Sequence, residues 1–460
     1  MKRTFWLFLL VVLLFGVRIS PAKAVLSPED EAILGKKILA EIRAQAELVN
    51  DPEVLAYLKR IGQNLLEKAG PKYFPFKFFI IRDSSLNAFA VPGGYIFFTS
   101  GLIEEVDRED ELAAVMAHEI AHVQARHVAR RLEALKRLQI ATGAVTIAGL
   151  LLGGGKAGGA IAATSSALAL TRALSYSRAD EEEADRLGFE YLIAAGYDPQ
   201  AFLTILSKIV RHRWLLTQNG PNYLLTHPAP PERLTYLETV VEKYKTRPWR
   251  RTDPLYLRRI QVRLKVITHD PGTLVVRYRE ALKYSPRDPL LHYGLGMALA
   301  KRRFFKEAIK ELLYVVSVYP EKDYFRLDLA EVYFSAGRYQ EALQVLEGYL
   351  RYHPEEVRAR WLLARTYQEL KLKKKAHEEF LKLEDELSDF PQFHFYFGKL
   401  LSDLGEEGRA HYEFGRYFTL KGDFKVATYH YQKALKNLPP DDPLREQIEK
   451  KLKSQARHKS

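Results

Sequence analysis

The chain of 460 residues contains no cysteine. This absence excludes a disulfide framework, a metal site built on thiolates, and a lipid attached to a cysteine behind a leader segment. Any metal ion that the protein binds must therefore be held by histidine, aspartate or glutamate side chains.

Long apolar runs are scarce as well. The chain begins with Met1-Lys2-Arg3, continues with an apolar run over residues 4–17 and then reaches Ala22-Lys23-Ala24. A charged start, an apolar centre and small residues in this order are typical of a secretory signal peptide, and we expect cleavage after Ala24. A retained anchor is the alternative, although the run is short for a bilayer span. The sequence thus predicts an exported protein.

Acidic residues are fewer than basic ones, and the formal net charge is +13. We expect this charge mainly on solvated faces. Peripheral contact with an anionic membrane surface, helped by a basic tail over residues 446–460, is the alternative. Nucleic acid is a poor partner for an exported protein, and we expect none. The length predicts two or three folded units.

The segment His118-Glu119-Ile120-Ala121-His122 is the strongest chemical signal in the chain. Two histidines four residues apart on a helix lie one turn above the other, so both can bind one metal ion. Zinc in such a site keeps one coordination position for water, and a glutamate on the same face can take that water's proton. The pattern predicts peptide-bond hydrolysis with Glu119 as general base. An amphipathic core helix with two buried histidines is the alternative.

The residues before this motif predict helices and a small sheet. Ser27 and Pro28 form a helix start, and Gly70-Pro71 ends a second helix. Apolar residues and turn signals predict strands over residues 76–81, 88–91 and 95–99.

The motif helix is expected over residues 109–129. On a straight helix, His127 is rotated from His118 by roughly 180°, at about 100° per residue, so we expect it to point away from the metal. The longer three-histidine zinc pattern is absent, because Ala125 and Val128 occupy its glycine and histidine positions. A third metal ligand must therefore come from elsewhere.

Residues 140–171 form an apolar, glycine-rich segment. Gly153-Gly154-Gly155 and Gly158-Gly159 divide it into halves that are each short for a membrane helix. We expect a mobile hairpin or lid near the active site, and a segment that dips into a membrane is the alternative.

An acidic run over residues 180–185 opens the next amphipathic helix. Helical spacing places Glu181 and Asp185 on one face with small and apolar residues, whereas Glu182 falls elsewhere. A carboxylate on an inward face needs a partner. We therefore expect Glu181 as the third metal ligand and Asp185 as the residue that orients a ligand histidine. Glu182 or Glu183 as the ligand is the alternative.

The histidine motif and Ser177-Arg178-x-x-Glu181-x-x-Ala184-Asp185 together resemble the metalloprotease superfamily of CAAX prenyl endopeptidases and HtpX. Two further segments are similar to motifs of that group, namely Asn-Ala-Phe-Ala-Val-Pro-Gly-Gly at residues 87–94, and Thr226-His227-Pro228 with Arg233. The resemblance implies a mostly helical α+β zincin-like domain with one Zn²⁺ per chain. It implies His118, His122 and Glu181 as ligands and Glu119 as a catalytic residue. Clear spanning helices are lacking, so prenylated substrates are not expected.

His227 is expected to return to the metal. There it either hydrogen-bonds the tetrahedral intermediate or occupies the open zinc position when no substrate is bound. A plain turn residue before Pro228 is the alternative. Arg233, which belongs to the same group of motifs, is expected to support the metal ligands.

We also expect an exposed strand edge beside the metal that pairs with an extended substrate backbone. The residues assigned to this edge are Asn87, Ala88, Phe89, Gly93, Gly94 and Phe97.

After a basic, proline-containing linker (246–254), the pattern changes to a repeat. Pro286, Pro320 and Pro354 recur every 34 residues. This period is typical of tetratricopeptide repeats and predicts an all-α superhelix over residues 255–445. The concave side of such an array binds extended segments or helices, and a simple spacer is the alternative.

The predicted order is a signal peptide (1–24), a zinc metallopeptidase domain (25–245), the linker and the repeat array. Because the linker is polar, we expect the two halves to fold separately. This order resembles the BepA-type periplasmic proteins.

The resemblance to those proteins implies quality control of envelope and outer-membrane proteins. Unfolded or misassembled envelope proteins would be the substrates, and the repeats would dock them or the outer-membrane assembly machinery. The alternative is a chaperone or scaffold for outer-membrane protein assembly with a largely latent metal site.

Overall fold

The computed structural model describes residues 26–137, 144–151, 175–215, 223, 227–228, 231–244 and 247–456. The predicted signal peptide, Thr226 and most of the predicted lid lie outside the described residues. Within those described ranges, no helix combines the length and the apolarity needed to cross a bilayer.

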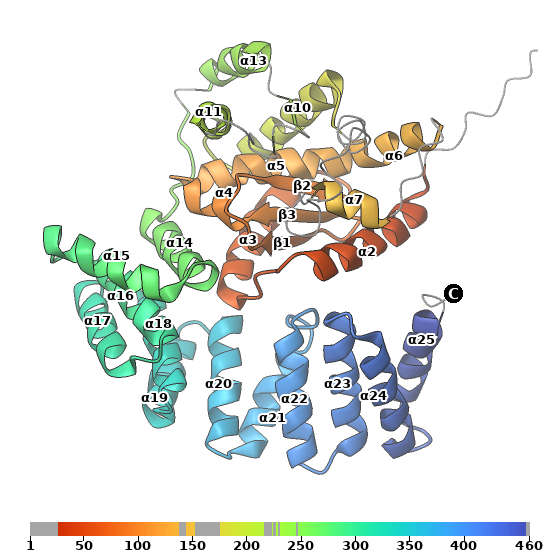
Figure 1. The fold of residues 1–460 in the computed structure, drawn as a ribbon, viewed down its shortest axis with the longest axis vertical. Helices are drawn as coiled ribbons and strands as arrows, with labels where there is room; N and C mark the ends of the chain where they lie inside the picture. The colour runs from red at the N-terminus through yellow and green to blue at the C-terminus, as the bar shows by residue number, and fades with distance from the viewer. Residues whose placement is uncertain are drawn as a thin grey trace, which may run out of the picture.

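The N-terminal unit is mostly helical, and its helices surround a small sheet (Figure 1). Its helices are α2 (Pro28–Gln45), α3 (Pro52–Leu66), α4 (Ser100–Glu105), α5 (Glu109–Gln124), α6 (His127–Arg137), α7 (Ala144–Leu151), α10 (Arg178–Ala194), α11 (Gln200–Leu215) and α13 (Pro231–Glu242). The predicted start of α2 is confirmed, since the Asp30 amide donates to the Ser27 hydroxyl at 3.1 Å and Pro28 begins the first turn.

The three predicted strands are confirmed as β1 (Lys77–Ile81), β2 (Ala88–Val91) and β3 (Tyr95–Thr99). Their order in the sheet is β1-β3-β2, with β1 parallel and β2 antiparallel to β3. Gly93 and Gly94 make the β2–β3 turn with φ of 82° and 86°, a conformation that favours glycine. A Cβ on Gly94 would also lie 2.8 Å from the carbonyl oxygen of Pro75. These glycines therefore shape the turn.

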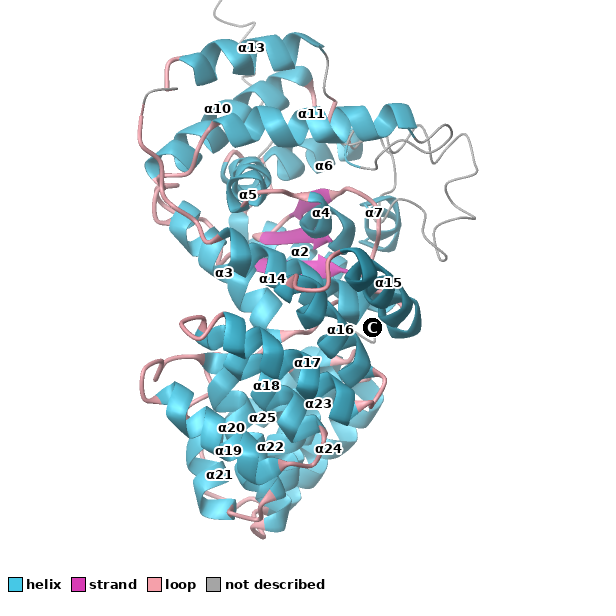
Figure 2. Cartoon of the chain, turned by 90° about the vertical axis from the view of Figure 1, so that its left-hand side faces the viewer, coloured by secondary structure: helices cyan, strands magenta, loops and turns pink. Residues whose placement is uncertain are grey.

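Helix α5 is the centre of the unit (Figure 2). It packs against α3, α10, α11 and β2, and its residues from Glu109 to Val123 are buried. The predicted extension to residue 129 is wrong. The helix ends at Gln124, and Arg126 adopts a positive φ of 55° before α6 begins at His127. Neither glycine nor proline marks this break in the sequence.

The C-terminal unit is an array of paired helices, as predicted. The helices are α14 (Pro254–Thr268), α15 (Pro271–Tyr284), α16 (Pro289–Lys301), α17 (Phe305–Val318), α18 (Asp323–Ser335), α19 (Tyr339–Leu350), α20 (Val357–Glu369), α21 (Lys373–Leu381), α22 (Pro391–Asp403), α23 (Glu407–Leu420), α24 (Phe424–Asn437) and α25 (Leu444–Ala456). Figure 1 shows α20 to α25 stacked side by side below the N-terminal unit, with α14 to α17 at the left.

Part of the predicted basic tail belongs to this array. Residues 446–456 lie in α25, whose Ile448 is fully buried against Tyr412 and Tyr431 of the preceding helices. The helix therefore covers the end of the array, and only residues 457–460 of the predicted tail lie outside the described residues.

Helix α14 connects the two units, which are adjacent in Figure 1. Its Leu257, Ile260 and Leu264 belong to the same buried cluster as the apolar residues of α3 and α5. The Gln261 amide donates to the carbonyl oxygens of Ile103 at 3.0 Å and Val106 at 2.6 Å. Separating the two units at the predicted linker would therefore expose apolar surface on α14 and on the N-terminal unit.

Buried ion pairs fix the array to the N-terminal unit. Glu53 of α3 accepts hydrogen bonds from Arg259 of α14 at 2.6 Å and from Arg358 of α20 at 2.9 Å. Arg259 and Arg358 also bind Asp328 of α18 at 2.6 and 2.7 Å. Glu53, Arg259 and Asp328 are at most 4% exposed. Removing one partner from such a network strands an uncompensated buried charge.

Glu53 is strongly held in its ionised form. Burial acts to raise the pKa of its carboxyl group, but Arg259 and Arg358 outweigh burial and hold the pKa far below its usual range. Because the folded-state pKa is the lower one, this ionisation stabilises the fold above the ordinary carboxyl range. That stability is lost as the pH falls.

We expect Glu53→Gln to lower the free energy of unfolding of the full chain by about 3–5 kcal/mol, because it leaves two buried guanidinium groups short of a partner. Glu386→Gln is the matched control. It removes a second contact between the units, the exposed Lys59–Glu386 pair at 2.7 Å, and we expect at most about 1 kcal/mol.

Urea unfolding followed by circular dichroism measures both variants. The wild type should also lose stability below about pH 5, and Glu53→Gln should show a smaller loss over the same interval. Equal effects of the two substitutions would contradict an interface held by the buried network.

Candidate metal centre

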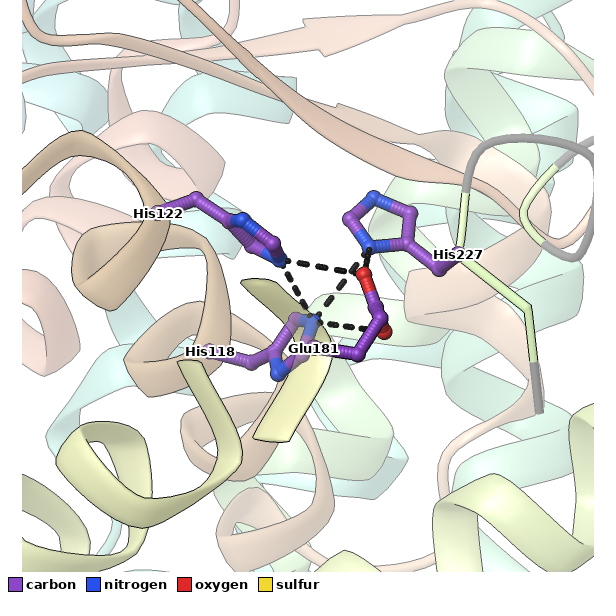
Figure 3. A group of neighbouring side chains, drawn as sticks. All are labelled: His118, His122, Glu181 and His227. Atoms are coloured by element: carbon purple, nitrogen blue, oxygen red, sulfur yellow. Dashed lines mark hydrogen bonds and ion pairs between the residues drawn. The ribbon is translucent and has the colours of Figure 1, made fainter. Parts of the chain in front are cut away.

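Helix α5 presents His118 and His122 to one buried point. Their Nε2 atoms lie 2.9 Å apart, and the exposed fractions of the residues are 1% and 0%. Figure 3 shows both rings directed from α5 toward Glu181 and His227. The expected helical pairing of the two histidines is therefore present.

Helix α10 brings Glu181 to the same point. A capping box between Ser177 and Asp180 begins the helix, so Glu181 lies in its first turn. Gly188 allows α10 to approach closely, because a Cβ there would lie 3.1 Å from backbone atoms of Ala117 and His118.

Glu181 alone of the three neighbouring glutamates reaches the histidines. Its Oε1 lies 3.4 Å from Nε2 of His122, and its Oε2 lies 3.6 Å from Nε2 of His118. Glu182 is exposed, and Glu183 contacts His127 and Arg130 instead. The two alternative ligands are therefore not brought to this point.

His227 completes the group. Its Nδ1 lies 3.0 Å from Oε1 of Glu181 and 3.3 Å from Nε2 of His118 (Figure 3). The ring stacks on Tyr223, with ring centroids 4.4 Å apart. His227 is fully buried, so it is not an exposed turn residue.

Two aromatic side chains that the sequence analysis missed line the histidines. Tyr176 stacks on His122 with ring centroids 3.9 Å apart, and Tyr223 stacks on His227. Both tyrosines are buried. They lie outside the recognised motifs, so no local sequence pattern pointed to them.

Asp185 and Arg233 hold the charged groups in place. Oδ1 of Asp185 lies 3.0 Å from Nδ1 of His118. Arg233 donates from Nε and Nη2 to Asp185 at 2.6 and 2.7 Å, and from Nη1 to Glu181. One guanidinium from α13 therefore offsets two buried carboxylates of α10.

Burial and neighbouring charges set the ionisation of the site. Burial raises the pKa of Glu119, and neither of its carboxylate oxygens has a hydrogen-bond partner among the described residues. Burial also acts to raise the pKa of Glu181, but Arg233 and the histidines outweigh it and hold that pKa well below its usual range. Burial lowers the pKa of His122 well below its usual value.

The pKa of His227 shifts in the opposite direction from that of His122. Burial acts to lower the pKa of His227, but the carboxylates of Glu181 and Glu119 outweigh burial and raise it. Its Nε2 lies 3.5 Å from Oε1 of Glu119. His227 thus lies between the other donors and the buried Glu119.

These donors fit a metal ion. One ligand atom from each of His118, His122, Glu181 and His227 lies within 4.8 Å of the others, and all four residues are buried. Tetrahedral zinc with bonds of about 2.0–2.1 Å separates neighbouring ligand atoms by roughly 3.3 Å. The separations of 2.9–3.4 Å between the closest donors agree with that spacing.

The rotation expected of His127 is wrong, because its ring faces His122, but His127 is a buried structural histidine outside the group of four donors. Its ring is fully buried, and its Nδ1 lies 2.7 Å from Nδ1 of His122. The positive φ of Arg126 turns the chain back, so the rotation expected for a straight helix does not apply.

The predicted substrate edge is only partly an edge. Phe97 lies in the central strand β3, where it pairs with Phe79 of β1 and Phe89 of β2. Its backbone is therefore paired on both sides, and assigning it to an edge is wrong. Asn87 precedes β2, and Ala88 and Phe89 lie in that outer strand, which packs beside α5. All three residues are at most 3% exposed, so the expected exposure of this edge is wrong.

Two segments of the chain match known protein families. Residues 52–241 match the family described as peptidase family M48, and residues 333–394 match a family described as tetratricopeptide repeat.

Three relatives illustrate the similarity. The chain is 37% identical over 215 residues to the beta-barrel assembly-enhancing protease of Escherichia coli, covering 46% of this chain and 44% of that protein. It is 31% identical over 312 residues to the Yersinia pestis protein of the same name, covering 67% and 64%. It is 30% identical over 186 residues to mitochondrial metalloendopeptidase OMA1 of Schizosaccharomyces pombe, covering 40% and 51%. The chain thus spans less than two thirds of each relative's length.

We expect Glu181→Gln to weaken metal binding by more than about 10-fold, the lower end of the loss seen when only an outer partner is removed. Glu182→Gln, one residue away and exposed, is the matched control and should bind metal like the wild type. Metal analysis of the purified proteins after dialysis against a weak chelator makes the comparison. Normal metal content in Glu181→Gln would remove Glu181 from the ligand set.

Proposed function

The chain carries a peptidase family M48 domain followed by tetratricopeptide repeats, and we propose that it is a zinc-dependent endopeptidase of the bacterial cell envelope. One observation carries this proposal. The buried donors of His118, His122 and Glu181 lie beside Glu119, whose carboxylate has no hydrogen-bond partner among the described residues. A purely structural metal site needs no such base.

His118, His122 and Glu181 would hold zinc, which when bound polarises a peptide carbonyl and lowers the pKa of a water molecule. Asp185, whose Oδ1 lies 3.0 Å from Nδ1 of His118, would orient that ring, and Arg233 would keep Glu181 ionised and oriented.

Glu119 acts on protons in this proposal. Its carboxylate accepts a proton from the attacking water and passes it to the nitrogen of the leaving amine. Burial raises its pKa, which makes Glu119 a stronger base than an exposed glutamate. The outer strand β2 next to α5 would hold the substrate backbone, since strand addition aligns an extended peptide without requiring one sequence.

The envelope assignment rests on the relatives and on the sequence. The Escherichia coli and Yersinia pestis relatives are named for enhancing β-barrel assembly. By analogy, we propose a periplasmic protein whose substrates are unfolded or misassembled envelope proteins. The repeat array would dock these substrates or the outer-membrane assembly machinery, since such arrays bind extended segments or helices.

A chaperone or scaffold with a latent metal site is the second candidate, and one observation favours it. Nδ1 of His227 lies among the ligand atoms and would occupy the position that an active site keeps for water or substrate. We propose that this contact represents a closed form of the protease and that His227 must leave for cleavage.

We expect Glu119→Gln to reduce cleavage of an unfolded outer-membrane protein by about 10²–10⁴-fold, because the amide cannot accept the proton. Metal content and thermal stability should stay at wild-type values, since Glu119 is not among the ligand atoms. Peptide release measured by mass spectrometry gives the rate. Unchanged cleavage would exclude Glu119 as the general base and, with it, the proposed protease mechanism.

We expect His227→Ala to raise the basal rate of casein cleavage, because it removes the side chain that closes the site. His353→Ala, in the array and 42% exposed by side chain, is the control and should leave the rate unchanged. A fall in cleavage by His227→Ala with metal retained would instead assign His227 to stabilising the transition state.

A further inference from the structure

His127 is the first residue of α6 and lies behind the metal-facing side of His122. Its ring is fully buried and lies 4.8 Å from the ring of His122, at an interplanar angle of 74°. Its Nδ1 lies 2.7 Å from Nδ1 of His122, and its Nε2 lies 3.0 Å from Oε2 of Glu183. The chain thus places a second imidazole between a candidate metal ligand and a carboxylate 39% exposed by side chain.

Only one arrangement of protons satisfies all three groups. His122 directs Nε2 at the donor group, and a metal ion bound there would use the lone pair of Nε2, so that Nδ1 carries the proton. The Nδ1 atom of His127 then accepts that proton in a hydrogen bond, and its Nε2–H donates to Glu183. Each ring nitrogen has one role, and the ionised carboxylate ends the series.

The two candidate ligand histidines therefore have different outer partners. Asp185 lies 3.0 Å from Nδ1 of His118, whereas the equivalent atom of His122 faces His127. Outer partners of this kind fix the tautomer and the ring orientation of a ligand histidine.

The break between α5 and α6 makes this contact. Arg126 has a positive φ of 55°, and its Nε donates to the buried carboxylate of Glu31 at 2.6 Å. This pair anchors the break to α2, and the chain reverses so that His127 faces His122. A continuous helix would place His127 on the opposite side.

We propose that His127 is a positioning residue that holds His122 in the tautomer and orientation required for metal binding, with Glu183 fixing His127 in turn. The inference rests on the proposed metal site. It adds a residue to that site that neither the histidine motif nor the group of four donors contains.

Two substitutions at His127 separate its two hydrogen bonds. Asparagine places an amide oxygen near the position of Nδ1, so His127→Asn keeps the acceptor for His122 and loses the donor to Glu183. Glutamine reaches the position of Nε2, so His127→Gln keeps the contact with Glu183 and loses the acceptor. His127→Phe keeps a flat ring and loses both. Competition with a chromophoric chelator for Zn²⁺ measures the affinity of each variant.

We expect His127→Gln and His127→Phe to bind Zn²⁺ about 10–100-fold more weakly than the wild type, with His127→Asn closest to it. The absorption bands of the Co²⁺-loaded protein, which report ligand geometry, should shift in His127→Gln and return toward wild type in His127→Asn. Thermal unfolding of the metal-free proteins identifies variants that do not fold. If the buried substitutions prevent folding, Glu183→Gln decides, and it should give a smaller but measurable loss of affinity.

Wild-type affinity in all folded variants would overturn the inference and leave the proposed function intact. Equal weakening by asparagine, glutamine and phenylalanine would also overturn it, because the effect would then follow packing and not the acceptor. Failure of the wild type to bind Zn²⁺ would instead refute the metal site itself.

Discussion

The structure depends on one constraint, which is that two histidine nitrogens and a carboxylate lie close together at one buried point. Nε2 of His118 and Nε2 of His122 lie 2.9 Å apart, and both face an ionised Glu181. Two lone pairs at this distance repel one another, so a proton or a metal cation must lie between the two nitrogens. The surrounding fold serves this arrangement. α5 is buried on all sides, Gly188 allows α10 to approach, and Arg233 balances the acids.

Local sequence patterns predicted most of the helices and strands, and they pointed to part of the candidate metal site. The strands, the start of α2 and the repeat period follow from turn residues, caps and periodic apolar positions, all of which are local signals. The inward face of α10 pointed to Glu181 and Asp185 for the same reason. Each of these features depends on residues within a few turns of one another.

The rest depends on contacts between distant residues. The break at Arg126 uses an arginine with positive φ, stabilised by Glu31 far along the chain, so no glycine or asparagine marks it. Strand β3 lies at the centre of the sheet because β1, which comes earlier in the chain, pairs with it on the side opposite β2. The residues of β3 alone do not reveal this second partner, so Phe97 was wrongly placed at an edge. Tyr176 and His127 likewise reach the site through contacts that no local sequence pattern shows.

The repeat array is fixed to the N-terminal unit. Glu53 lies in α3, which packs against α5, and the same carboxylate binds Arg259 and Arg358 of the array. A partner that shifts α20 would therefore act on α3, which is in direct contact with α5, the helix of His118 and His122. Packing and buried charge thus join the two units.

The most direct test of the metal centre is the position of the metal itself. Crystals of the purified protein, measured above and below the zinc absorption edge, would locate any zinc by its anomalous signal. We expect one peak bound by Nε2 of His118, Nε2 of His122 and a carboxylate oxygen of Glu181. A peak bound by other residues, or a fully folded protein with no peak after incubation with zinc, would contradict a zinc peptidase.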